Sequence, residues 1–174
     1  MQQDFMSRRR FDREPCSIAQ ALEILGDWWT LLIIRDAFLG VRRFVDFQTR
    51  LGISKNILAR RLSHLVARGV LATVDAGVHG PRYEYELTAR GKDLFTVITA
   101  LRQWGDRWVF GPGHEPLVVV DRRTGRPLPR VRVVGEDGQP VPREAMQVTL
   151  GPGAAVAPPT APRARRPRAP RRSR

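Results

Sequence analysis

The chain has 174 residues, of which 30 are lysine or arginine and 17 are acidic, so its formal net charge at pH 7 is +13. This composition suits one domain with extensions and indicates an anionic partner or a basic tail. The single cysteine excludes an intramolecular disulfide framework, and three histidines without ligand spacing give no reason to expect a metal or another cofactor. No apolar run is long enough to span a bilayer and the N-terminus lacks a signal core, which predicts a cytoplasmic protein without a membrane partner.

The N-terminal part of the chain predicts an arm followed by two helices. Residues 1–15 are polar and rich in arginine, so we expect a flexible arm there. Ser17 is the expected N-cap of a helix over 18–25, which Gly26 ends. Asp27 caps the next predicted helix, 28–39, which is apolar on nearly all sides. We therefore expect this second helix to be the central buried one.

The next segment has the pattern of a helix-turn-helix. A short helix over 43–51 is expected to meet a helix over 55–68 through a tight turn at 51–54, with Ser54 as N-cap and Gly69 as the terminating residue. One face of the second helix is apolar, and the opposite face carries Asn56, Arg60, Ser63, His64 and Ala67. The pattern also suits an amphipathic core helix with a solvated basic face. The turn before it and the hairpin after it favour a recognition helix.

A β-hairpin is predicted directly after this helix. Residues 70–74 read as one strand, and residues 83–87 alternate between polar and apolar side chains as a second strand. The loop between them is rich in turn-forming residues and carries His79 and Arg82. Because it follows a predicted recognition helix, we interpret the hairpin as a wing that contacts DNA. The alternative is a plain edge hairpin.

A long helix over 89–108, capped by Thr88, is expected to form a dimer interface. Its apolar stripe is longer than a domain of this size needs for its own core, which indicates a two-fold contact with the same helix of a second subunit. Packing wholly within one chain is the alternative. The expected interface residues are Leu94, Ile98, Leu101, Trp104 and Trp108. Residues 16–110 would thus form one DNA-binding and dimerisation domain.

The C-terminal third predicts two further segments. Residues 111–150 are expected to form a small β-rich appendage with strands over 117–121, 130–134 and 147–150. Residues 151–174 are dominated by proline, alanine and arginine, contain seven arginines and no acid, and are expected to be disordered. Two roles for this tail stay open, which are sequence-independent attraction to nucleic acid and solubilisation.

The chain resembles the HxlR family of bacterial winged helix-turn-helix regulators, and the resemblance covers residues 16–105. It is carried by Cys16 before a helix and by the following motifs: Gly26-Asp27-Trp28-Trp29-Thr30-Leu31-Leu32-Ile33, Arg43-Phe44, Gly52-Ile53-Ser54, Leu58, Arg61-Leu62, Leu65, Gly69, Tyr83-Glu84-Tyr85-Glu86-Leu87-Thr88 and Gly91. The resemblance implies an α+β winged helix-turn-helix fold, mainly α with a β-hairpin wing. It also implies a homodimer that binds a palindromic operator in double-stranded DNA and regulates neighbouring genes.

The early cysteine departs from the family pattern, because Ser17 follows it where the family usually has proline. Some members sense oxidants through this cysteine, so Cys16 is a possible redox site. This chain offers no second cysteine, so a disulfide would need the partner's cysteine or a small thiol. We favour a buried or inert Cys16 over a redox sensor, since free cysteines are commonly buried.

The DNA-contacting residues follow from the predicted recognition helix. Asn56 can pair with adenine and Arg60 with guanine at the base edges, with Lys55, Ser63 and His64 as neighbouring candidates. Ser54 and Arg61 are expected to contact phosphate or fix the turn. Arg43 and the wing residue Arg82 are further candidates for phosphate contacts.

Three other functions remain as alternatives. A non-specific nucleoid-type DNA-binding protein would depend on the basic tail, and an interaction module would be built on residues 111–150. An enzyme would need Cys16 or His64 joined to a base and an orienting group, and the sequence shows no such constellation. An unknown small-molecule effector is also possible, in a pocket lined by the four tryptophans, although core and dimer packing is the favoured use of Trp28, Trp29, Trp104 and Trp108.

Overall fold

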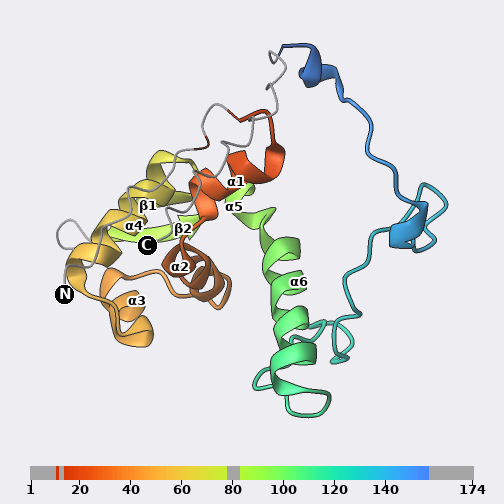
Figure 1. Ribbon diagram of the computed structural model, residues 1–174. Coiled ribbons are helices and arrows are strands. Elements are labelled where there is room, and N and C mark those ends of the chain that lie inside the picture. The colour runs from red at the N-terminus through yellow and green to blue at the C-terminus, as the bar shows by residue number, and fades with distance from the viewer. Residues whose placement is uncertain (1–10, 12–13, 78–82, 157–174) are drawn as a thin grey trace, which may run out of the picture.

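The computed structural model describes residues 11, 14–77 and 83–156, which form a winged helix-turn-helix domain followed by an extended C-terminal segment (Figure 1). The elements of the domain follow one another in the predicted order. They are α1 (Ser17–Leu25), α2 (Trp28–Phe38), α3 (Phe44–Leu51), α4 (Lys55–Ala67), β1 (Leu71–Asp75), β2 (Tyr83–Leu87), α5 (Ala89–Lys92) and α6 (Phe95–Gly105).

The core lies where α2, α3 and α4 meet the base of the hairpin. Its fully buried members are Ile33, Ile34, Phe47, Leu58, Leu62, Leu65, Val70 and Leu71. The prediction that this helix is the central buried one is confirmed, because Thr30, Ile33, Ile34 and Asp36 of α2 are buried, although Trp28 at its start is 75% exposed. Asp36 of α2 is fully buried and forms ion pairs with Arg35 at 2.9 Å and Arg50 of α3 at 3.3 Å, which fastens α3 to α2.

Local capping explains where the helices begin. Asp27 accepts a hydrogen bond from the backbone N–H of Trp29 at 2.9 Å, and Ser54 accepts one from Ile57 at 3.4 Å, which confirms both predicted caps. Gly52 ends α3 in the left-handed region at φ 61°, where a glycine is favoured. The predicted cap at Ser17 is wrong, because Ser17 is the first helical residue and Cys16 precedes it without a side-chain capping bond.

The wing is a two-stranded antiparallel hairpin with Leu71 opposite Leu87 and Thr73 opposite Tyr85. Strand β1 begins one residue later than predicted. The Tyr85 ring stands edge-on to Phe47 at 6.4 Å between centroids, and burial raises the pKa of the Tyr85 phenol because it disfavours the charged form. The predicted loop residues His79 and Arg82 lie outside the described residues.

The predicted continuous helix over 89–108 is wrong, because the chain forms α5, turns at Asp93 and Leu94, and continues as α6 and the π-helical turn η1 (Asp106–Phe110). Thr88 caps α5 by accepting a hydrogen bond from Gly91 at 3.1 Å. The break lets α5 stay against the base of the wing while Leu94 packs against the core.

The three strands predicted within 111–150 are also wrong. The described chain there has only two isolated β-bridges, Val120 with Pro127 and Val134 with Pro140, and the short 3₁₀ turn η2 (Arg143–Ala145). Proline lacks the N–H that a ladder needs, and it occupies one side of each bridge, so pairing does not extend. A second 3₁₀ turn, η3 (Pro152–Val156), lies in the segment 151–174 that was expected to be disordered. The rest of that segment, 157–174, lies outside the described residues.

Across the described ranges, no single helix is long and apolar enough to cross a membrane. The pair α1 and α2 meets the length and composition criterion jointly, but it is bent by 77°.

Candidate nucleic-acid interface

Helix α4 presents one exposed polar face and one buried apolar face. Leu58, Leu62 and Leu65 are fully buried, so the helix is fixed to the core along its whole length. The opposite side is open to solvent and carries, from the cap onward, Ser54, Lys55, Asn56, Arg60 and Ser63. We call these five residues the open face of α4. Their order and spacing agree with the predicted recognition helix.

Two residues of the predicted DNA-contacting set, Arg61 and His64, face the protein, and for Arg61 the sequence had offered the alternative that it fixes the turn. Arg61 donates a hydrogen bond to Asp27 at 2.6 Å, and both side chains of this ion pair are about one-fifth exposed. His64, which the helical wheel placed on the open side, is half-buried, and its Nε2 lies 3.2 Å from the carbonyl oxygen of Ile24. Both residues therefore join α4 to the start of α2 and the end of α1.

The loop before α3 connects the helix-turn-helix to the wing. Arg43, the residue before α3, is exposed as a phosphate contact requires. Its neighbour Arg42 forms an ion pair with Glu86 at 2.5 Å, and the Arg42 carbonyl accepts a hydrogen bond from the Tyr85 N–H at 2.9 Å. Sequence reasoning missed this pairing, since the two residues lie 44 positions apart and no local pattern links them.

The charge of this surface is positive. Three exposed cations lie along α4 and its C-terminal cap, namely Lys55, Arg60 and Arg68. Helix α4 contains no acidic residue. Arg43 adds a further cation at the start of α3. A helix of this kind fits the major groove of B-DNA, which is about 12 Å wide, and places cations beside the phosphates.

The predicted dimer residues divide into two groups. Leu94 and Ile98 are partly buried against the chain's own core. Leu101, Trp104 and Trp108 are 51%, 57% and 63% exposed, and they extend along α6 into η1. The second group is an apolar surface without cover within the described chain.

Cys16 is exposed, so of the two expected alternatives, buried or inert, the first is wrong. It precedes α1, and its own backbone is extended. Within the described residues no cluster of three or more histidine, cysteine or acidic side chains is arranged to hold a metal ion.

The tryptophans line neither of two cavities of the described chain. A cavity of about 290 Å³ lies between α1, Val70 and the α5–α6 region and is lined by Gln20, Ala21, Ile24, Leu25, Val70, Arg90 and Leu94. A second cavity of about 400 Å³ lies between the end of α6 and residues 112–130. Trp28, Trp104 and Trp108 are exposed instead.

Comparisons with known proteins agree with this geometry. The model of the HxlR-like helix-turn-helix family matches residues 24–111. An uncharacterised HTH-type transcriptional regulator of Mycobacterium tuberculosis is 44% identical over 108 residues, covering 62% of this chain and 67% of the relative. An uncharacterised HTH-type regulator of Synechocystis is 33% identical over 95 residues, covering 54% of this chain and 70% of the relative.

Solved structures show the same fold. The candidate transcription factor PA1607 superimposes with a TM-score of 0.75 at 41% identity, over 81% of this chain and 99% of its own. The candidate transcription factor PA1374 of Pseudomonas aeruginosa has a TM-score of 0.57 at 40% identity, over 80% of this chain and 94% of its own. The chain therefore belongs to the HxlR-like helix-turn-helix family of transcriptional regulators.

Proposed function

We propose that this protein is a sequence-specific transcriptional regulator that binds, as a homodimer, an operator made of two symmetric half-sites. The open face of α4 is the observation that carries the proposal. Its polar side chains project from a helix whose other face is locked into the core. A fixed helix with an exposed polar and cationic face is what reading of base edges requires.

The residues of the open face have different proposed roles. Asn56 reads adenine and Arg60 reads guanine, each through two hydrogen bonds in the major groove, with Lys55 and Ser63 beside them. Ser54 and Arg43 contact phosphates, and so does the wing residue Arg82. Arg61 and His64 act indirectly, because their contacts with Asp27 and Ile24 set the position of α4.

The proposed dimer forms through the exposed apolar surface of α6 and η1. A two-fold contact is self-complementary, so Leu101, Trp104 and Trp108 of one subunit meet the same surface of the other. Burial of such large side chains supplies most of the free energy of an interface. Two recognition helices related in this way enter successive major grooves about 34 Å apart.

The competing functions make different demands on the chain. A nucleoid-type binder needs only positive charge, whereas the open face combines amide, hydroxyl and guanidinium groups at one-turn spacing. An enzyme would need Cys16 or His64 as its nucleophile or base. Cys16 precedes α1, and His64 lies on α4 with its ring next to the backbone carbonyl of Ile24. We favour a regulator that acts in the cytoplasm.

Footprinting tests the proposal. The full-length chain is incubated with the intergenic DNA beside its own gene and with a scrambled duplex of equal length. We expect two protected half-sites whose centres are separated by about 10 base pairs or a multiple, related by two-fold symmetry. Uniform protection of both duplexes without boundaries would support the nucleoid-type alternative.

A further inference from the structure

The end of α6 and the segment that follows it border a cavity of about 400 Å³. One wall comes from the last turn of α6 and from η1, and the other comes from residues 112–130. The match with the HxlR-like family ends at residue 111, so the second wall belongs to a part of the chain beyond the family match. Small-molecule sites in proteins have volumes of about 300 to 1,000 Å³, and this cavity lies within that range.

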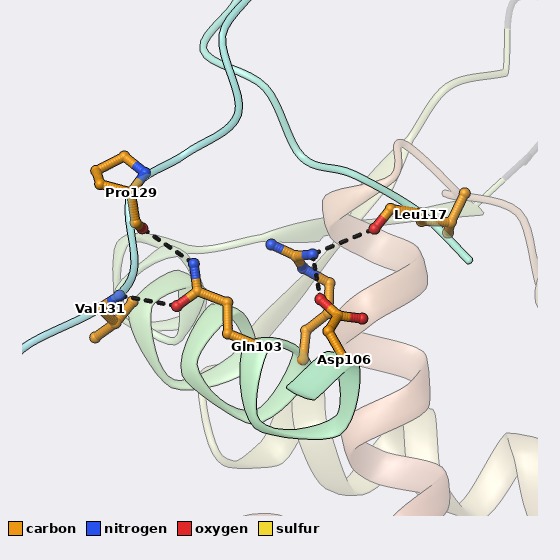
Figure 2. A network of polar contacts seen from close by, with 6 residues as sticks. Gln103, Asp106, Leu117, Pro129 and Val131 are labelled. Atoms are coloured by element: carbon orange, nitrogen blue, oxygen red, sulfur yellow. Dashed lines mark hydrogen bonds and ion pairs between the residues drawn. The ribbon is translucent and has the colours of Figure 1, made fainter. Parts of the chain in front are cut away.

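Side chains of α6 hold the two walls together. The Gln103 side chain donates a hydrogen bond to the Pro129 carbonyl at 3.0 Å and accepts one from the Val131 N–H at 2.8 Å (Figure 2). Arg102 donates to the Leu117 carbonyl at 3.3 Å, so the segment is attached to the helix on both sides of the cavity. Because these bonds form without a ligand, the cavity is preorganised and a ligand does not have to order its walls.

The charged groups that line the cavity do not all neutralise one another. Arg102 forms an ion pair with Asp106 at 2.8 Å, which cancels both charges. Arg107 and Arg130 also line the cavity, and neither forms an ion pair with another group of the described chain. Glu115 is the remaining carboxylate, and its pKa is lowered by hydrogen bonds from backbone N–H groups, so it stays ionised. Two cations and one carboxylate therefore face the cavity without an ion-pair partner.

The rest of the lining is apolar and comes from Val118, Val119, Pro127 and Leu128. The Leu128 N–H donates a hydrogen bond to the Val119 carbonyl at 2.9 Å, so these two residues face each other across the turn of the segment. An apolar wall next to unpaired guanidinium groups fits a molecule with an apolar body and one anionic end. Guanidinium groups bind carboxylates through two parallel hydrogen bonds, which fixes the orientation of the ligand.

We propose that this cavity is the binding site of a small organic monocarboxylate. Its carboxylate binds Arg107 and Arg130, and its apolar body packs on Val119 and Leu128. Glu115 restricts the charge of the ligand, because a phosphate or a dicarboxylate would bring a second negative charge close to this carboxylate. Helix α4 contributes none of the residues that line the cavity, so the inference does not depend on the proposed reading of DNA.

Isothermal titration calorimetry of the full-length chain tests the site. The probes are sodium benzoate and sodium hexanoate, with benzyl alcohol and 1-hexanol as their uncharged counterparts and inorganic phosphate as an anion of higher charge. We expect one of the carboxylates to bind with a Kd below about 1 mM, its alcohol to bind about tenfold more weakly, and phosphate not to bind. Equal affinities for the carboxylate and its alcohol, or stronger binding of phosphate, would overturn the inference. So would the absence of binding by both carboxylates at about 10 mM.

Substitutions test which arginines hold the carboxylate. Arg107→Gln and Arg130→Gln each remove one cation from the cavity, and each should weaken binding of the carboxylate about tenfold. Arg126→Gln is the matched control, because Arg126 is exposed in the same segment and is not among the lining residues. It should leave the affinity unchanged. Equal affinities of all three variants would show that the carboxylate does not bind at this cavity.

Amide chemical shifts measured by NMR locate the ligand independently of any substitution. When the carboxylate is added to the full-length chain, we expect the largest shift changes at the backbone amides of Val119 and Leu128 and at those of residues 102–107. The amides of α4 serve as the internal control and should not move. Changes confined to α1 or α4 would place the ligand elsewhere and overturn the assignment of the cavity.

Discussion

A β-carbon added to Gly91 would lie 2.2 Å from the carbonyl oxygen of Val70 and 3.0 Å from Cδ2 of Leu87. This close approach packs α5 against the residue that joins α4 to the wing. Thr88 reinforces it by donating a hydrogen bond to the Gly69 carbonyl at 2.6 Å. Helix α4, the wing and α5 therefore meet at one point of the chain, where only glycine fits.

Replacing Gly91 with alanine should destabilise the domain by about 2 to 3 kcal/mol, because the obstructing atom belongs to the backbone and cannot rotate away. Gly105→Ala is the matched control. Gly105 is helical, nothing lies within 4 Å of its β-carbon position, and alanine there should stabilise by about 0.5 to 1 kcal/mol. Chemical denaturation of both variants measures the difference, and equal effects would contradict the tight packing at Val70.

The pair of Asp27 and Arg61 should be a major contributor to the stability of the helix-turn-helix. Asp27 caps α2 and binds Arg61 of α4 with only about one-fifth of either side chain exposed. Asp27→Ala removes the cap and leaves the largely buried guanidinium of Arg61 unpaired. We therefore expect a loss of about 2 to 3 kcal/mol in the free energy of unfolding.

Glu86→Ala supplies the comparison, because it breaks an exposed ion pair with Arg42. In that pair the side chain of Arg42 is 55% exposed and that of Glu86 is 40% exposed. Its cost should stay below about 1 kcal/mol. Thermal unfolding of Asp27→Ala, Arg61→Ala and the double variant completes a mutant cycle. A coupling energy near zero would show that Arg61 is free to act in DNA binding instead.

Arg60→Ala should weaken operator binding by about 1 to 3 kcal/mol and weaken random DNA less, because a base contact is lost together with one charge. Arg123→Ala removes the same charge from a side chain that is 87% exposed in a turn after α6, and it should have little effect on either DNA. Competition binding with single-base operator variants identifies the position that Arg60 reads. Equal losses of affinity for operator and random DNA would indicate that Arg60 contacts a phosphate instead of a base.

Removal of residues 157–174, which include the seven arginines of the tail, should preserve the preference for the operator while reducing the salt dependence of binding. Each phosphate contact contributes about 0.9 to the slope of log K against log salt concentration. Titrations at four salt concentrations compare the two chains. If the shortened chain binds operator and scrambled DNA equally, the tail is the source of sequence specificity.

Sequence patterns predicted most of the winged domain, because its elements are defined by local signals. The caps at Asp27, Ser54 and Thr88 lie at the start of helices, and the leucines of α4 repeat at helical spacing. Such signals act over three or four residues and are visible in one sequence. The open face of α4 followed from the same spacing.

The errors arose where distant contacts decide the structure. The helical wheel placed His64 on the open side and could not show its contact with the carbonyl of Ile24, which lies 40 positions away. In the same way, the partner of Arg61, Asp27, lies 34 positions away and no local pattern links the two. The local pattern also did not show the close approach of Gly91 to Val70, which packs α5 beside the wing. In the C-terminal segment, apolar alternation favoured strands, but the prolines at both bridges prevented them from forming.

The proposed function requires that the open face of α4 selects a DNA sequence. Fluorescence anisotropy with the intergenic DNA beside the protein's own gene and with a scrambled duplex, at several salt concentrations, tests it most directly. We predict that the full-length chain and the chain without residues 157–174 both prefer the native fragment at moderate salt, and that Arg60→Ala loses this preference. Binding that is equal on both duplexes and disappears with the tail would contradict it.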